Sequence, residues 1–256
     1  MIGTTRRPFR GLLTTCVALV FVAAACGGSS STPGLGGGVP TLNLGGGGGG
    51  GGGTGSLSSG LAGNLDKLDS YQFAETMSGS SFGAGASSDS SGATISGTVI
   101  NKPDKREWIN FAGSQFIVIG DQEWISSDGT TWTPTGSNTS AFSTFLPSML
   151  YGTWFDSFAS GYKSAGDDTQ NGIACTHYKG DNSINALYGS LAGVQGTFTA
   201  DLWIAKDGGY PVKGVLAFSA TAGGQAGTFG YTLDVTHVND STANVVAQPS
   251  VDANPS

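Results

Sequence analysis

Along most of the chain, apolar and polar residues alternate with a period of two, the spacing of a strand with one buried face. The clearest case is GTFGYTLDVTHV, where Phe229, Tyr231, Leu233 and Val235 share one face. The short AGS connection between KREWINF and SQFIVIG predicts a hairpin. Further strand-like segments are YQFAETM, ATISGTVIN, QEWIS, GIACTHYKG, GTFTADLWIAKDGG and YPVKGVLAFSATAG.

Two local features bear on these strands. The Asp-Gly pair at 128–129 predicts a turn after QEWIS. In FIVI both alternations are apolar, so the pattern leaves open whether Phe116 and Val118 or Ile117 and Ile119 face the core.

Three segments instead carry apolar residues at helical spacing. The first begins at Leu61 and ends near Asp69. The second, residues 140–160, has Ser140 as a candidate N-cap and contains Pro147, which we expect to kink or split it. The third is DNSINALYGSLAG. The apolar face of the second segment consists of Phe142, Phe145, Leu146, Met149 and Leu150.

The order of these elements is a helix, five or six strands, helices, and about four more strands. This order predicts an α+β fold, with one large antiparallel sheet and helices on a single face. We place the domain at residues 61–249, which is long enough to bury roughly 70% of its surface.

The N-terminal residues carry an export signal. Arg6, Arg7 and Arg10 precede the uncharged segment 11–25, which is shorter than the roughly 20 residues of a membrane-spanning helix. VAAAC resembles a bacterial lipobox, so we interpret residues 1–25 as a signal peptide and Cys26 as the site of a diacylglycerol anchor. An ordinary signal with an incidental cysteine is the alternative. TRRPFR also resembles a twin-arginine signal, and the export route stays open.

Composition separates a tether from the domain. Residues 26–60 are rich in Gly and Ser and predict a flexible tether, while residues 250–256 predict a disordered tail. Loss of residues 1–25 removes three arginines and changes the formal net charge from −7 to −10. So acidic a chain has no electrostatic basis for binding nucleic acid. Cys175 would be the one cysteine left beside Cys26, so we expect no disulfide and a buried thiol.

Catalytic chemistry has one weak candidate. GSSFG matches G-x-S-x-G with Ser81 as nucleophile, and Asp168 and then His177 or His237 follow in hydrolase order. A glycine-rich connection follows Ser81 instead of a helix, so we expect no enzyme. The histidines lack spaced partner ligands, and we interpret GDDTQNG as a solvated turn. We expect no metal and no cofactor beyond the acyl anchor.

The segment ADLWIAKDGGYPVKGVLAF, together with SYQF, VIGDQEWISSDGTTW and NGIACTHY, resembles the LolA-like half-barrel lipoproteins, including the LppX/LprG group. This resemblance implies an unclosed antiparallel half-barrel curled around helices, with a cavity for lipid or glycolipid acyl chains and no catalytic residues. It also implies a possible envelope transporter as partner. A filled core serving protein interaction or envelope sensing is the alternative.

From the resemblance and the alternation we expect a monomeric carrier, held by Cys26 on the extracytoplasmic face of the cell membrane. Residues 146–150 would form a movable lid with Gly152 as its hinge. The residues expected to line the cavity are Phe73, Val99, Phe111, Val118, Leu146, Met149, Leu150, Leu202, Leu216, Phe218, Tyr231 and Leu233.

The lipobox interpretation predicts the behaviour of Cys26→Ala. We expect this variant to lose incorporation of a labelled fatty acid in vivo, because the thioether to diacylglycerol needs the thiol. Gel autoradiography of the immunoprecipitated protein measures the label. Unchanged labelling would refute the assignment of Cys26.

Overall fold

The structure of the chain is a computed structural model that describes residues 57, 60–80, 90–135, 146–180, 195–222 and 225–250. The chain divides into Met1–Gly52, which lies outside the described residues, and Gly53–Ser256, which contains the folded domain. The predicted signal peptide, Cys26, Ser81 and the helix predicted over DNSINALYGSLAG also lie outside them.

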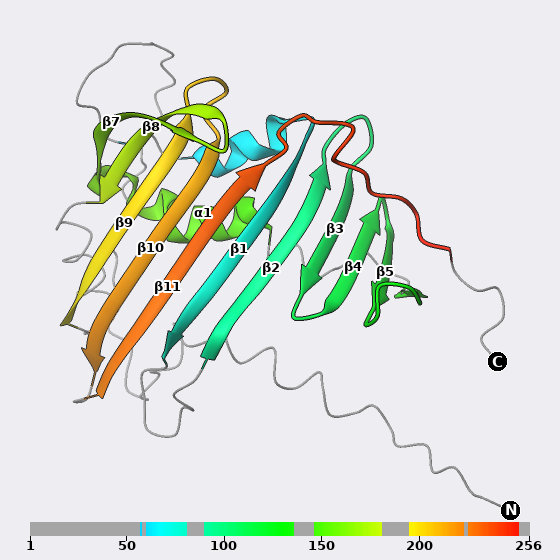
Figure 1. Ribbon diagram of the computed structural model, residues 1–256, viewed down its shortest axis with the longest axis horizontal. Coiled ribbons are helices and arrows are strands. Elements are labelled where there is room, and N and C mark those ends of the chain that lie inside the picture. The colour runs from blue at the N-terminus through cyan, green and yellow to red at the C-terminus, as the bar shows by residue number, and fades with distance from the viewer. Residues whose placement is uncertain are drawn as a thin grey trace, which may run out of the picture. The chain divides into compact units, whose positions relative to one another are not determined.

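One antiparallel sheet of eleven strands forms the body of the domain (Figure 1). Its order is β6-β5-β4-β3-β2-β1-β11-β10-β9-β8-β7, so two meanders meet where β1 pairs with β11. The sheet does not close, since β6 and β7 lie at its opposite edges. The strands are β1 (Ser70–Ser80), β2 (Ser90–Ile100), β3 (Arg106–Phe111), β4 (Ser114–Ile119), β5 (Gln122–Ser126), β6 (Thr133–Pro134), β7 (Tyr162–Gln170), β8 (Ile173–Gly180), β9 (Gln195–Ala205), β10 (Pro211–Ala222) and β11 (Gln225–Thr236).

Within the described residues, three short helices accompany the sheet. They are the 3₁₀ helix η2 (Leu61–Lys67), the α-helix α1 (Pro147–Trp154) and the 3₁₀ helix η4 (Asp156–Gly161). Helix α1 contacts η2 and η4, and η2 contacts β10. We call the face that carries them the concave face and the opposite one the outer face. The predicted α+β half-barrel, a large unclosed antiparallel sheet with helices on one face, is confirmed.

Pro147 has a different role from the predicted one. It is the first residue of α1 rather than a kink within a longer helix, and Leu146, in an extended conformation, precedes it as the N-cap. Proline fits this position because its φ is already helical and the first helical N–H has no intrahelical partner. The predicted N-cap Ser140 lies outside the described residues.

The strand pairing decides which alternation in FIVI faces inward. Phe116 lies opposite Ile109 of β3, which is 1% exposed, and Phe116 itself is 2% exposed. Phe116 and Val118 therefore share the concave face, and Ile117 and Ile119 face outward. The hairpin predicted between KREWINF and SQFIVIG is confirmed, with β3 and β4 paired in register.

Two predicted turns have different outcomes. The Asp128-Gly129 turn is confirmed, since it lies in the connection between β5 and β6. The interpretation of GDDTQNG as a turn is wrong for most of its length. Residues 166–170 belong to β7, and Asn171 and Gly172 alone make the turn to β8, both with positive φ.

A second, smaller apolar cluster covers part of the outer face. Ile117 and Trp124 pack there with Val246, which follows β11 in the C-terminal segment 237–250. The segment is held to the sheet by hydrogen bonds from Gln72 Nε2 to the Ala243 carbonyl (3.0 Å) and from Arg106 Nη1 to the Val246 carbonyl (3.3 Å). The C-terminal segment therefore passes over β1 and β3 and completes the outer cluster (Figure 1).

Close packing on the concave face predicts the cost of a methyl group at Gly97 on β2. A Cβ there would meet the Trp108 carbonyl oxygen and the Phe73 ring, the latter at 2.7 Å. We expect Gly97→Ala to lower the free energy of unfolding by about 2 kcal/mol, since overpacking costs about 1–3 kcal/mol. Gly63→Ala is the control, because nothing lies within 4 Å of its Cβ position. Urea unfolding of both variants measures the effect, and equal stabilities would contradict it.

Candidate functional site

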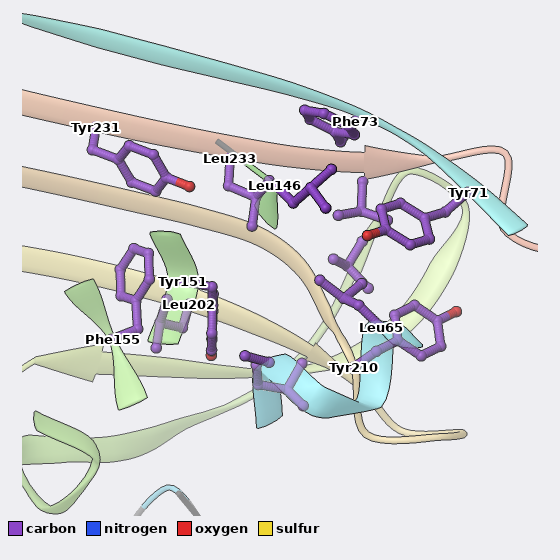
Figure 2. Packing of buried hydrophobic residues seen from close by; sticks show 14 of the residues in the cluster. Leu65, Tyr71, Phe73, Leu146, Tyr151, Phe155, Leu202, Tyr210, Tyr231 and Leu233 are labelled. Atoms are coloured by element: carbon purple, nitrogen blue, oxygen red, sulfur yellow. The ribbon is translucent and has the colours of Figure 1, made fainter. Parts of the chain in front are cut away.

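The concave face carries one continuous apolar cluster, and most of the predicted lining residues belong to it (Figure 2). Phe111 and Phe218 pack against the cluster while partly buried, and Val118 is half-buried on the same face. The side chains of Met149 and Leu150 lie outside the described residues, so the contacts of these two residues of the expected lid are not described. The buried predicted members are Phe73, Val99, Leu146, Leu202, Leu216, Tyr231 and Leu233.

Aromatic residues of α1 and its surroundings, which the alternation pattern did not reveal, fill the space against the sheet. Phe155 lies with its ring centroid 4.9 Å from that of Tyr151 and 5.9 Å from that of Tyr231. Figure 2 shows these three side chains between α1 and the strands. Tyr151 and Phe155 are 0% exposed. Phe155, the C-cap of α1, therefore contacts the concave face, and Tyr151 of α1 packs against Phe155.

Two aromatic rings of the concave cluster, those of Phe73 and Phe155, lie directly over glycines of the sheet. A Cβ at Gly97 would meet the Phe73 ring at 2.7 Å, and one at Gly214 of β10 would meet the Phe155 ring at 2.9 Å. The missing side chains make room for the rings. At these two points the concave face is filled by the chain itself.

Three glutamates also face the concave side, and the prediction of lining residues omitted them. Glu75, Glu107 and Glu123 are 0%, 5% and 6% exposed. Glu107 is paired with Lys105 Nζ at 3.0 Å, and Glu123 Oε1 accepts a hydrogen bond from Thr135 Oγ1 at 3.1 Å. Glu75 has no such cation beside it among the described residues. Its sequence signal was present in YQFAETM, where an acid occupies an inward position of the alternation.

Glu75 is a polar group in the middle of an apolar face. The Tyr231 hydroxyl donates a 2.8 Å hydrogen bond to Glu75 Oε1, while Glu75 Oε2 has no hydrogen-bond partner among the described residues. Burial raises the pKa of Glu75 to about 8, against a smaller opposing effect of the Tyr231 hydrogen bond. Burial, together with Glu75, holds the pKa of Tyr231 well above its usual value. At pH 7 the pair is therefore uncharged.

Two pockets formed by described residues lie elsewhere. One, of about 650 Å³, is lined mainly by polar and charged residues around Asp69, Lys102, Arg106 and Asn244. The other, of about 440 Å³, lies at the far ends of β1, β10 and β11 and includes Phe218. Of the predicted lining residues, Phe218 alone lines one of these two pockets, the second.

The residues considered for hydrolysis do not form a triad in the described part of the chain. Asp168 Oδ2 accepts a 2.7 Å hydrogen bond from the Trp203 indole, and His177 Nε2 lies 2.7 Å from Asp201 Oδ1. The His177 ring stacks on Trp203 at 4.4 Å. His237 lies beyond β11, 3.6 Å from Asp240 Oδ2. Asp168, Trp203, His177 and Asp201 thus form one group of polar contacts, and His237 lies in a separate contact.

Other candidate chemistry can be placed as well. Cys175 is a free, buried thiol, and burial raises its pKa, as expected for a structural cysteine. Within the described residues no group of three or more His, Cys, Asp or Glu side chains could hold a metal ion. None of the described helices is long and apolar enough to cross a membrane.

Comparison with known proteins yields structural matches. LppX, a lipoprotein of Mycobacterium tuberculosis, is 19% identical with a TM-score of 0.35, covering 75% of this chain and 98% of LppX. LprF of Mycobacterium bovis is 14% identical with a TM-score of 0.41, covering 77% and 99%. A chain of the MucA/MucB complex of Pseudomonas aeruginosa is 16% identical with a TM-score of 0.33, covering 75% and 62%. No family model matches the sequence, and the curated proteins contain no match. LppX, a member of the group that the sequence resembles, is thus among the matched structures.

The raised pKa of Glu75 predicts a pH dependence of stability. Its pKa is about 8 in the folded protein against an ordinary value of 4.5, so the folded state binds the extra proton between these values. The free energy of unfolding therefore falls as pH rises through this window, by up to about 1.4 kcal/mol per pH unit. We expect Glu75→Gln to remove this slope. Urea unfolding of both proteins from pH 5 to 8 measures it, and parallel curves would contradict the assignment.

Proposed function

We propose that this protein is a membrane-anchored lipoprotein that binds a hydrophobic ligand, a lipid or glycolipid acyl chain, on the concave face of its half-barrel. The observation that carries the proposal is the continuous apolar cluster on one face of an unclosed sheet, covered by short helices alone among the described elements. Binding would be driven by apolar burial, worth about 0.8 kcal/mol for each CH₂ taken out of water.

The proposed anchor gives the carrier its location. Diacylglycerol on Cys26 would hold the domain on the extracytoplasmic face of the cell membrane, and residues 26–60 would serve as the tether. A span of roughly 30 Å follows from a Gly-rich chain of this length. The domain could then exchange ligand with the membrane or with an envelope transporter while remaining attached.

For the ligand to enter, the aromatic contacts between α1 and the sheet must open. Residues 146–150 with Gly152 form the proposed lid and hinge. Tyr151 of α1 packs on its C-cap Phe155, whose ring lies against Tyr231 of the sheet. Movement of this helix would expose the cluster around Tyr231 and Leu233. The protein would act without catalysis and as a monomer.

A second candidate function is supported by the rings over Gly97 and Gly214. If the whole concave face is filled in the same way, the domain is an interaction or sensor module that binds a protein partner on its surface. The two functions differ in one measurable property, the presence of lipid in the purified protein.

The carrier proposal predicts that an unanchored form, residues 27–256 without the lipidated Cys26, contains lipid near one equivalent when it is exported in a related bacterium behind a cleavable signal. Mass spectrometry of organic extracts measures it. Val118→Trp should reduce the recovered lipid at least twofold, because the larger ring occupies the concave face. Its neighbour Ile119→Trp is the matched control on the outer face and should leave the lipid content unchanged. A lipid-free wild-type protein that also takes up no acyl-chain probe would favour the interaction module.

A further inference from the structure

The strongest feature outside the predicted lining set is the carboxyl group of Glu75. It leaves β1 on the concave face and lies opposite Leu233 of β11 and Ile95 of β2, each of which is 0% exposed. Phe73 and Met77 are its inward-facing neighbours on β1. A carboxyl group thus occupies the centre of the apolar cluster.

The hydrogen bonding of this carboxyl group is incomplete. Oε1 accepts from the Tyr231 hydroxyl at 2.8 Å, and Oε2 has no partner within the described part of the chain although the residue is fully buried. Burial raises the pKa of Glu75 to about 8, so the carboxyl group holds its proton at pH 7. Because Tyr231 donates to Oε1, the acid proton falls on Oε2, and the described residues provide no acceptor for it.

A buried donor without an acceptor is unfavourable, and natural proteins rarely keep one without a function. The other two buried acids on this face are supported differently. Glu107 has Lys105 at 3.0 Å. Glu123 resembles Glu75 in that Oε1 accepts from Thr135 at 3.1 Å while Oε2 has no partner among the described residues, but it lies on β5 near the edge of the sheet and is 6% exposed. Of these three glutamates, Glu75 is the one that is 0% exposed, and it lies beside the central β1–β11 pair rather than near an edge of the sheet.

We propose that Glu75, oriented by Tyr231, is the polar anchor of the ligand site and donates a hydrogen bond from Oε2 to an uncharged oxygen of the bound molecule. This inference rests on the proposed function and specifies the chemistry of its ligand. An ester carbonyl or a hydroxyl group satisfies the donor. A carboxylate or phosphate at this depth would place an uncompensated charge in an apolar environment, and the site disfavours it. The anchor also sets how far the ligand enters, since its polar group must reach β1.

The test uses three pyrene-labelled probes of equal chain length: an alkane, a fatty acid methyl ester and the free fatty acid. Fluorescence titration of the unanchored form, residues 27–256, at pH 7 measures each affinity. We expect the ester to bind about tenfold more tightly than the alkane, the effect of one net hydrogen bond, and the free acid to bind more weakly than the ester.

Variants at the pair locate the preference. Glu75→Leu should bind ester and alkane equally while remaining folded, because it replaces a buried acid by an apolar side chain of similar size. Glu75→Gln keeps an uncharged donor and should retain the preference for the ester. Tyr231→Phe removes the orienting hydroxyl and should reduce it.

Each other outcome is decisive. Equal affinity of the wild-type protein for ester and alkane overturns the anchor but leaves the carrier proposal standing. Retention of the ester preference in Glu75→Leu also overturns the anchor alone. If none of the three probes binds, the proposed function fails, and the anchor fails with it.

Discussion

The pairing of β1 with β11 is the interaction on which the rest of the structure depends. It joins the two meanders, and its register places Phe73 opposite Val235 and Glu75 opposite Leu233. Asn239 lies at the end of this strand pair and holds it through two hydrogen bonds. Its side-chain Oδ1 accepts from the backbone N–H of Asp69 at 2.7 Å, and its backbone N–H donates to the Ser70 carbonyl at 2.8 Å. The hydrogen bond from Tyr231 to Glu75 crosses the same strand pair. A slip of β1 by one residue would turn each of its side chains to the opposite face. The concave cluster and the buried carboxyl group of Glu75 therefore both require this register.

Much of the fold could be predicted because each strand carries its own alternation. Tyr231, Leu233 and Val235 are buried as the period of two requires. FIVI could not be resolved, since both of its faces are apolar and the choice depends on pairing with β3 and on the outer cluster around Trp124. The β1–β11 pair joins segments at opposite ends of the domain, and no local pattern encodes such a contact.

The candidate site was predictable to a smaller degree. Alternation correctly placed Phe73, Val99, Leu202 and Leu216 in the concave cluster, because apolar residues on the inward side of a strand are buried in most sheets. Selection by hydrophobicity could not find Glu75. An acid in an inward position predicts either an exposed edge or a buried polar group, and the distinction requires the neighbouring strands β2 and β11.

The C-terminal segment gives the outer face a property that the sheet alone would lack. Val246 covers Ile117 and Trp124, and the Arg106 guanidinium and the Gln72 amide hold the segment in place through its backbone. Because residues 237–250 follow β11 in the sequence, the whole sheet is synthesised before them, and Trp124 remains uncovered until they emerge. A chain that ends after β11 would expose the apolar surface around Ile117 and Trp124, and chaperones and proteases bind such exposed surfaces. The outer cluster is therefore covered only once residues 237–250 have packed on the sheet.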